Sequence, residues 1–166
     1  MVLEYNEVYM LLGSNLGDRE LMMRQAIERI AEEIGEVSAT SALYETEPWG
    51  NVDQPSFINL AILVRTSLDP VSVLEKALHI EKELGRVRLE RWGSRTIDID
   101  LIFFGDDILN VEGKLTIPHP EMQNRRFVLA PLAEIAPAFV HPKLGKTVQD
   151  LLESLKDDTP VKKYNF

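Results

Sequence analysis

Two aspartates, Asp98 and Asp100, stand one residue apart in the segment RWGSRTIDIDLIFFG, which covers residues 91–105. The segment reads as a β-strand, on which residues two apart share a face, so both carboxylates project the same way with α-carbons roughly 6.6 Å apart. Two like charges at this separation repel by about 2–3 kcal/mol at an effective dielectric near 20. The pair therefore predicts a cationic partner, and Mg²⁺ suits carboxylate oxygens of this kind. The plain alternative is a solvated face of an amphipathic strand.

The apolar residues of this strand predict where the carboxylates lie. We expect the face opposite the aspartates to carry Ile97, Ile99, Leu101 and Phe103, and the aspartate face to continue as apolar through Ile102 and Phe104. A strand of this kind runs into a core, so the two carboxylates should sit at the edge of that core.

Arginines gather just before the two aspartates. Residues 86–95, RVRLERWGSR, hold four arginines and one glutamate, and a second basic pair, Arg125 and Arg126, follows His119. The whole chain has a net charge of −9, which argues against a general nucleic-acid binder. Guanidinium groups recognise phosphate in a bidentate manner, so a local cationic patch beside paired carboxylates predicts a nucleotide polyphosphate held with Mg²⁺.

The usual nucleotide-binding loops are missing. GSNLGD, residues 13–18, lies between a predicted strand and a predicted helix, but it has neither the lysine of a P-loop nor the spacing of a dinucleotide-binding turn. A tight strand-to-helix turn is the interpretation we favour.

Length and composition set broad limits. A chain of 166 residues suits one domain over its whole length, and no cysteine is present to form disulfides or thiolate metal sites. Three scattered histidines make a zinc site improbable. No apolar run reaches about 18 residues, and the amino terminus carries Glu4 and Glu7, so we expect a cytoplasmic protein that binds no membrane.

Alternating strands and helices should position these residues. We expect a strand at 8–12 that stops at Gly13, and a helix capped by Asp18 that ends at Gly35 and buries Ile27, Ile30, Ala31 and Ile34. A weaker strand lies within 41–48, and a clear one covers 57–66.

The second half continues the alternation. Asp69 and Pro70 open a second helix that Gly85 closes, a strand follows at 96–105, a turn at 105–107 leads into ILNVEG, and 148–156 reads as a short helix. The order β-α-β-β-α-β with appended C-terminal elements predicts an α+β protein, a ferredoxin-like α/β sandwich with an antiparallel sheet.

Four segments together carry a resemblance. RWGSRTIDIDLIFFG, LLGSNLGDR, DQPSFINLAI and IPHPEMQNRRFVLAPL are similar to the 6-hydroxymethyl-7,8-dihydropterin pyrophosphokinases of the folate pathway, over about residues 8–140. The resemblance implies a ferredoxin-like monomer that transfers the β,γ-pyrophosphoryl unit of ATP to the hydroxymethyl group of the pterin and releases AMP.

The resemblance also assigns site residues. It implies that Asp98 and Asp100 hold two Mg²⁺ ions and that Arg86 and Arg95 join them in catalysis. The residues implied for ATP, the co-substrate, are Arg86, Arg88, Trp92, Arg95, Ile99, Leu101, Lys114, Thr116, His119 and Arg125, with the backbone near Ile99 and Leu101 meeting adenine. Those implied for the pterin are Thr46, Pro48, Trp49, Gly50, Asn59 and two stacking rings, Phe57 and Phe127.

Some residues depart from the family pattern, and other functions stay open. Phe57 stands where relatives carry tyrosine, and Pro120 also replaces a frequent tyrosine. Arg126 replaces a residue that is often small, and we expect its side chain to point to solvent. One alternative is another Mg²⁺-dependent nucleotidyl- or phosphotransferase, and a second is a regulatory domain that binds a small molecule without turnover. Taken singly, Phe57 and Phe127 would be core residues.

Overall fold

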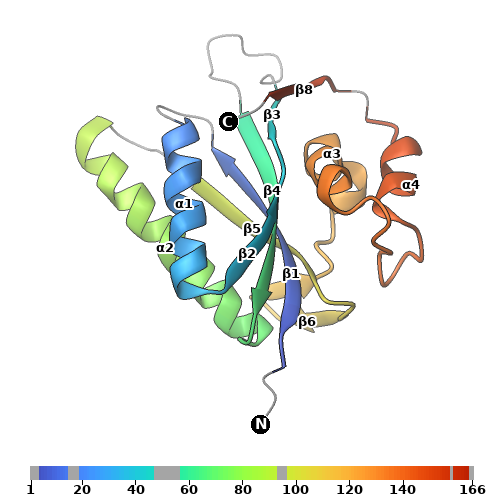
Figure 1. Ribbon diagram of the computed structural model, residues 1–166, viewed down its shortest axis with the longest axis horizontal. Helices are drawn as coiled ribbons and strands as arrows, with labels where there is room; N and C mark the ends of the chain where they lie inside the picture. Colours follow the sequence, from blue (N-terminus) through green and yellow to red (C-terminus); the bar gives the residue numbers. More distant parts are fainter. Residues whose placement is uncertain (1–3, 15–18, 47–56, 93–96, 158, 165–166) are drawn as a thin grey trace.

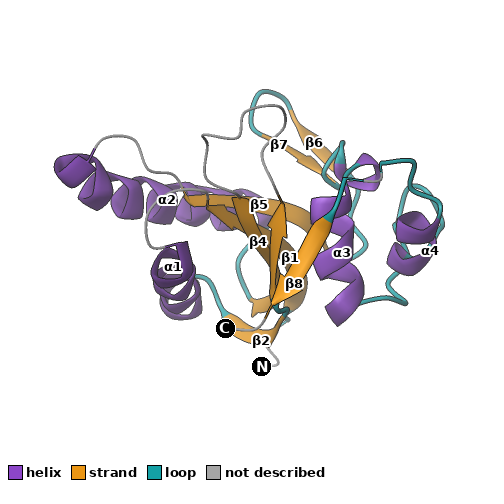
Figure 2. Cartoon of the chain, turned by 90° about the horizontal axis from the view of Figure 1, so that it is seen from above, coloured by secondary structure: helices purple, strands orange, loops and turns teal. Residues whose placement is uncertain are grey.

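An antiparallel sheet forms the middle layer of the molecule, and helices cover both of its faces (Figure 1, Figure 2). The computed structural model describes residues 4–14, 19–46, 57–92, 97–157 and 159–164, with 86–92 described as backbone. Within these ranges the sheet has the strand order β5-β1-β4-β3-β8, and β2 pairs with β4 next to β3. Its strands are β1 (Asn6–Ser14), β2 (Glu36–Thr40), β3 (Leu43–Thr46), β4 (Phe57–Thr66), β5 (Ile97–Phe104) and β8 (Val161–Tyr164).

The helices divide between the two faces. One face is covered by α1 (Arg19–Glu33) and α2 (Pro70–Trp92), and the other by α3 (Arg126–Ile135) and α4 (Val148–Glu153) (Figure 2). A small hairpin of β6 (Leu109–Val111) and β7 (Leu115–Ile117), followed by a 3-10 turn at Met122–Asn124, connects β5 to α3. The order β1-α1-β2-β3-β4-α2-β5, in which β2 and β3 both pair with β4, confirms the predicted ferredoxin-like α+β fold with appended C-terminal elements.

Each face of the sheet has its own apolar core. The larger core lies under α1 and α2 and includes Met10, Leu12, Ile30 and Ile62, which are all fully buried. The smaller one lies under α3 and α4 and includes Tyr9, Leu129 and Leu132. No helix in the described part of the chain is long and apolar enough to cross a membrane.

A β-bulge in β5 changes which residues face each core. Tyr9 pairs with Phe103 but Met10 pairs with Leu101, so Ile102 is the extra residue. Phe103 therefore joins the α3 and α4 side, where its ring lies 4.5 Å from that of Phe139, and Phe104 joins the opposite core. The prediction was correct for Ile102 and wrong for Phe103 and Phe104, because the bulge reverses the alternation after Ile102.

The first helix ends where predicted, but its buried face is shifted. Ile30 and Ile34 are buried, whereas Ala31 is exposed, contrary to the prediction; Met22, Met23 and Ala26 complete the buried face. Gly35 follows the helix because a Cβ at this position would lie 2.2 Å from the backbone oxygen of Arg65. Asp18 lies outside the described residues.

The second helix begins as predicted and ends later. The Asp69 carboxylate accepts a hydrogen bond from the Ser72 backbone N–H at 3.2 Å, which makes Asp69 the N-cap before Pro70. Gly85 does not close the helix, which continues to Trp92, so residues 86–92 are helical. An interior glycine costs only about 1 kcal/mol relative to alanine, and the helix-forming residues after Gly85 outweigh that cost.

Candidate active site

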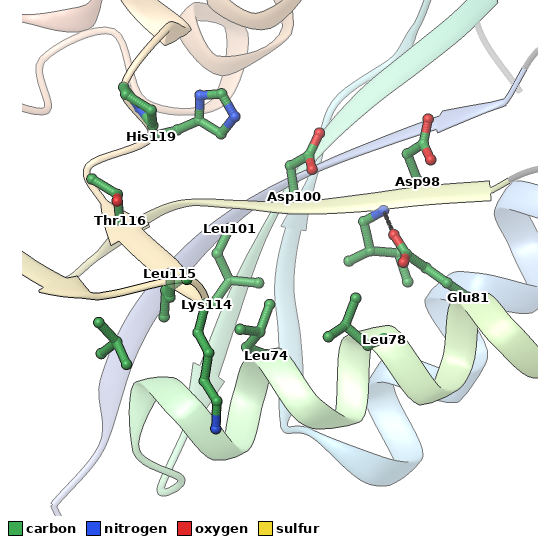
Figure 3. A pocket seen from close by; sticks show the side chains of 14 residues that line it. Leu74, Leu78, Glu81, Asp98, Asp100, Leu101, Lys114, Leu115, Thr116 and His119 are labelled. Atoms are coloured by element: carbon green, nitrogen blue, oxygen red, sulfur yellow. Dashed lines mark hydrogen bonds between the residues drawn. The ribbon is translucent and has the colours of Figure 1, made fainter.

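The strand β5 lies at an edge of the sheet and carries the two aspartates. Its burial alternates from Ile97 to Leu101, so that Asp98 and Asp100 reach solvent while Ile99 between them is buried. Figure 3 shows the two carboxylates rising side by side from the same face of β5. Partial burial raises the pKa of both carboxyl groups, and the neighbouring Asp100 charge raises that of Asp98 further. The two carboxylates therefore share one face, as predicted, and water only partly offsets the repulsion between their charges.

His119 lies across from Asp100, on the segment that follows β7 (Figure 3). Its backbone N–H donates to Ile102 O at 3.0 Å, and its Nδ1 accepts from the Glu121 backbone N–H at 3.2 Å. Because Nδ1 is an acceptor, the neutral ring carries its proton on Nε2. Burial lowers the pKa of His119, although the Asp100 charge acts in the opposite direction. In its neutral form His119 thus offers an Nε2–H donor near the aspartates.

Arg125 lies near both Asp100 and Phe127, the ring predicted to stack on the pterin. Burial raises the pKa of Asp100, and the positive charges of protonated His119 and of Arg125 oppose that rise. The Arg125 guanidinium also lies 5.8 Å from the centroid of the Phe127 ring. Two predicted ATP residues and one predicted pterin residue therefore lie in one neighbourhood.

A cavity of about 590 Å³ opens at the free edge of β5. This volume lies within the range of small-molecule sites. The cavity is bounded by α2, β5, the β6–β7 hairpin and the turn after it. Its lining includes the predicted residues Asp98, Ile99, Asp100, Leu101, Lys114, Thr116 and His119. The structure therefore brings seven of the predicted site residues to one hollow.

The sequence analysis missed the α2 wall of this cavity. Leu74, Leu78 and Glu81 line it, and their i, i+4, i+7 spacing is the signal that one helix face is shared. Glu81 Oε2 accepts the Ile99 backbone N–H at 2.6 Å (Figure 3). Burial raises the pKa of Glu81 to about 7; the Ile99 bond opposes this rise, and the charges of Asp98 and Asp100 add to it. Three carboxyl groups thus gather along β5.

The predicted pterin residues of β3 and β4 lie on the same face of the sheet as the aspartates. Gly13 of β1 pairs with Asp98 on one side and with Asn59 on the other, and paired residues of antiparallel strands share a face. Asn59 is buried, and Phe57, two residues earlier, is 38% exposed and pairs with Thr46. With strands about 4.8 Å apart, Asp98 and Asn59 stand about 10 Å apart across the sheet.

Gly13 and Thr46 show how this end of the sheet is shaped for a ligand. A Cβ on Gly13 would lie 2.6 Å from Asn59 Oδ1, so the observed position of the Asn59 side chain requires glycine at position 13. β1 continues through Gly13 to Ser14, which corrects the prediction that Gly13 stops the strand. The Thr46 hydroxyl is buried and has no hydrogen-bond partner among the described residues. A buried, unpaired hydroxyl is costly unless a bound molecule satisfies it.

Other predicted residues are not placed by these observations. Pro48, Trp49, Gly50 and Arg95 lie outside the described residues. Arg86, Arg88 and Trp92 belong to the last turns of α2, and their side chains lie outside the described part. Arg126 does not point freely to solvent as predicted, because its Nε donates to the backbone oxygen of Asp157 at 3.1 Å.

Comparison with known proteins gives a direct assignment. The model of the 7,8-dihydro-6-hydroxymethylpterin-pyrophosphokinase (HPPK) family matches residues 9–137. The chain belongs to the HPPK family. It is 47% identical over 131 residues to a 2-amino-4-hydroxy-6-hydroxymethyldihydropteridine pyrophosphokinase of Bacillus subtilis, covering 78% of each chain. It is 46% identical over 148 residues to the protein of the same name from Methylorubrum extorquens, covering 89% of this chain and 92% of the relative.

Solved structures agree on the HPPK fold. A crystal structure of a Plasmodium falciparum HPPK-DHPS triple mutant matches with a TM-score of 0.75 and 20% sequence identity. The match covers 90% of this chain and 43% of that chain, so this chain spans less than half the length of the solved protein. At this identity the likeness supports the fold alone.

Proposed function

We propose that this chain performs the reaction for which the HPPK family is named, with its own residues in the roles given below. The β,γ-pyrophosphoryl group of ATP passes to the hydroxymethyl oxygen of 6-hydroxymethyl-7,8-dihydropterin, in folate synthesis. A bond forms between that oxygen and the β-phosphorus, the bond from the β-phosphorus to the oxygen bridging it to the α-phosphorus breaks, and AMP leaves. The observation that carries the proposal is the shared sheet face on which Asp98, Asp100, Asn59 and Thr46 lie.

Asp98 and Asp100 fit a divalent cation. Both are carboxylates whose burial raises the pKa, and a bound cation would remove their repulsion. A pair of carboxylates suits Mg²⁺, which is commonly held by one or two carboxylates and shares its other positions with water and phosphate oxygens. We assign two Mg²⁺ ions to this pair, where they would neutralise charge on the ATP phosphates.

The cavity at the edge of β5 suits the nucleotide. Leu74 and Leu78 supply an apolar wall for a base, while Thr116 and Lys114 supply polar groups on the opposite hairpin. The backbone of Ile99 lies at the free edge of β5, where its N–H donates to Glu81. An adenine at this edge would use the remaining backbone groups of β5, in the way that an added strand does.

His119 and Arg125 suit the phosphate groups. The neutral His119 ring offers an Nε2–H donor beside Asp100, and Arg125 adds a permanent positive charge. Pyrophosphoryl transfer needs positioning and charge neutralisation more than covalent help. Family membership assigns four more residues to the ATP phosphates, namely Arg86, Arg88, Trp92 and Arg95.

The pterin half of the site is assigned to β3, β4 and the start of α3, across the same sheet face from Asp98. Phe57 and Phe127 are assigned to the two faces of the pterin ring, since flat rings gain from offset stacking. Asn59 and the unpaired Thr46 hydroxyl are assigned to its polar edge. The spacing of about 10 Å between Asn59 and Asp98 leaves room for the ring between them and its hydroxymethyl group near the aspartates. Pro48, Trp49 and Gly50 complete the assignment.

Two substitutions test these roles. Asp98→Asn and Asp100→Asn should each lower turnover by at least about a hundredfold, the loss typical of removing one electrostatic group from a transition state. Neither should lower the melting temperature, because each removes a charge whose burial is unfavourable. Asp107→Asn, in the exposed turn after β5, is the matched control and should stay fully active. Turnover near that of the wild type in either site variant would contradict the assignment.

A further inference from the structure

The C-terminal segment returns to the part of the sheet that carries the proposed pterin site. The family model ends at residue 137, and the chain then forms α4 and comes back as β8 (Figure 1). β8 pairs with β3 along its whole length, with Val161 opposite Thr46 and Lys163 opposite Tyr44. The strand that presents the unpaired Thr46 hydroxyl is therefore flanked by the chain's own tail.

Glu134 joins this tail to both β3 and α3. Its carboxylate accepts the Tyr44 hydroxyl at 2.6 Å and the Ala42 backbone N–H at 3.1 and 3.2 Å. Lys163 of β8 approaches the same carboxylate at 3.4 Å. Since Glu134 lies on α3, one carboxylate holds a helix and two strands together.

Asp157 forms a second connection, at the start of α3. Its carboxylate accepts the Arg126 backbone N–H at 3.4 Å, and its backbone oxygen accepts Arg126 Nε at 3.1 Å. Thr159 fixes Asp157 in turn, donating its N–H at 2.9 Å and its hydroxyl at 2.6 Å to the carboxylate. The first turn of α3 has no cap from the Arg125 side chain, so Asp157 places an acidic group at this helix N-terminus.

The contacts of Glu134 and Asp157 are made with β3 and with the start of α3, two elements that carry predicted pterin residues. Arg126 lies between Arg125 and Phe127, and Tyr44 lies two residues before Thr46 on the same strand face. The nucleotide cavity, in contrast, is lined by α2, β5 and the β6–β7 hairpin with its turn. The tail is thus tied to one half of the site.

We propose that the C-terminal segment of Asp157 and Val161–Tyr164 is a positioning element for the pterin half of the active site, acting through Arg126 and Glu134. It sets the position of α3, which carries Phe127, relative to β3, whose Thr46 pairs with Phe57. This position decides how well a flat ring fits between Phe57 and Phe127. The inference rests on the proposed function. Asp157 and Glu134 are positioning residues and contact neither substrate.

Steady-state kinetics with each substrate varied in turn test this inference. Asp157→Ala and Glu134→Ala should each raise the KM for the pterin roughly fivefold, which equals the ~1 kcal/mol typical of a lost helix cap. The KM for ATP should rise clearly less than that for the pterin, because the nucleotide cavity does not depend on these contacts and only Arg125, beside Arg126, is shared. Glu134→Gln keeps an acceptor for the Tyr44 hydroxyl and should restore most of the pterin KM.

The control separates positioning from general loss of stability. Thr147 caps α4, an element that bears no assigned site residue, by accepting the Asp150 N–H at 3.0 Å. Thr147→Ala should lower the melting temperature about as much as Asp157→Ala and leave both KM values unchanged. Suppose that the wild type is active. An unchanged pterin KM in both alanine variants, or equal rises in the KM for the pterin and the KM for ATP, would then overturn this inference alone. A folded wild type that forms no pterin diphosphate would overturn the proposed function, and the inference with it.

Discussion

Glu81 provides a test of how charge is arranged along β5. Its carboxylate lies in the cavity wall, accepts the Ile99 N–H and stands near the two aspartates. Glu81→Gln keeps an oxygen acceptor for that N–H and removes the negative charge. We expect this variant to be more stable than the wild type at neutral and alkaline pH.

The size of the effect follows from the pKa of Glu81. Its rise from 4.5 to about 7 sets an upper limit of about 3 kcal/mol, at 1.36 kcal/mol per pKa unit. The side chain is partly open to solvent, which screens its charge, so we expect a gain of about 1–2 kcal/mol. Because the folded pKa is raised, the wild type keeps full stability below pH 4.5 and loses this contribution as the pH rises through about 7. The gain in the variant should therefore appear over that interval.

Urea unfolding at pH 4.5, 6 and 8 measures this difference. The free energy of unfolding of the Glu81→Gln variant should match the wild type at pH 4.5 and exceed it increasingly up to pH 8. Glu75→Gln, the same change at an exposed position of α2, is the control and should show no such trend. A variant that is less stable than the wild type at pH 8, or a gain that does not change with pH, would refute the reasoning.

Three further substitutions test other close contacts. Gly13→Ala places a Cβ 2.6 Å from Asn59 Oδ1, so the pterin KM should rise by roughly tenfold or more while the ATP KM stays constant; equal effects on both would contradict the role of Asn59. Gly35→Ala meets the Arg65 backbone oxygen and should lower the free energy of unfolding by about 1–3 kcal/mol in urea; no loss would show that the close approach relaxes freely. His141 is buried with its pKa lowered by desolvation, so wild-type stability should fall as the pH drops below about 6.5, whereas His141→Asn should flatten that fall in unfolding measured from pH 5 to 8.

Local sequence patterns were sufficient for the main elements of the fold. The alternation in 57–66 and the Asp69-Pro70 pair predicted β4 and the start of α2, because each depends on neighbouring residues only. The bulge in β5 could not be predicted, since residues 101–104 are all apolar and their order does not fix a register. Gly13 and Gly85 were both predicted to end an element. Instead, Gly13 lies inside β1 and leaves room for the Asn59 side chain of β4, and Gly85 is tolerated inside a helix.

The candidate site follows the same division. Asp98 and Asp100 were evident from a two-residue spacing, and the family motifs supplied most of the remaining assignments. The place of Glu81 in the cavity was not predicted, because its partner Ile99 lies 18 residues away on a different element. Arg126 was predicted to face solvent because its partner Asp157 lies 31 residues later, in a tail whose pattern predicted no strand. Contacts of this range depend on the tertiary fold and leave no local signal.

The nucleotide product tests the central claim most directly. Wild-type protein is incubated with ATP, Mg²⁺ and 6-hydroxymethyl-7,8-dihydropterin, beside a reaction that lacks the pterin, and the products are separated by chromatography. Attack at the β-phosphorus predicts pterin-dependent AMP in an amount equal to the pterin diphosphate, and a large loss of both products with Asp100→Asn. ADP with a pterin monophosphate, or no pterin-dependent product from folded protein, would contradict the account.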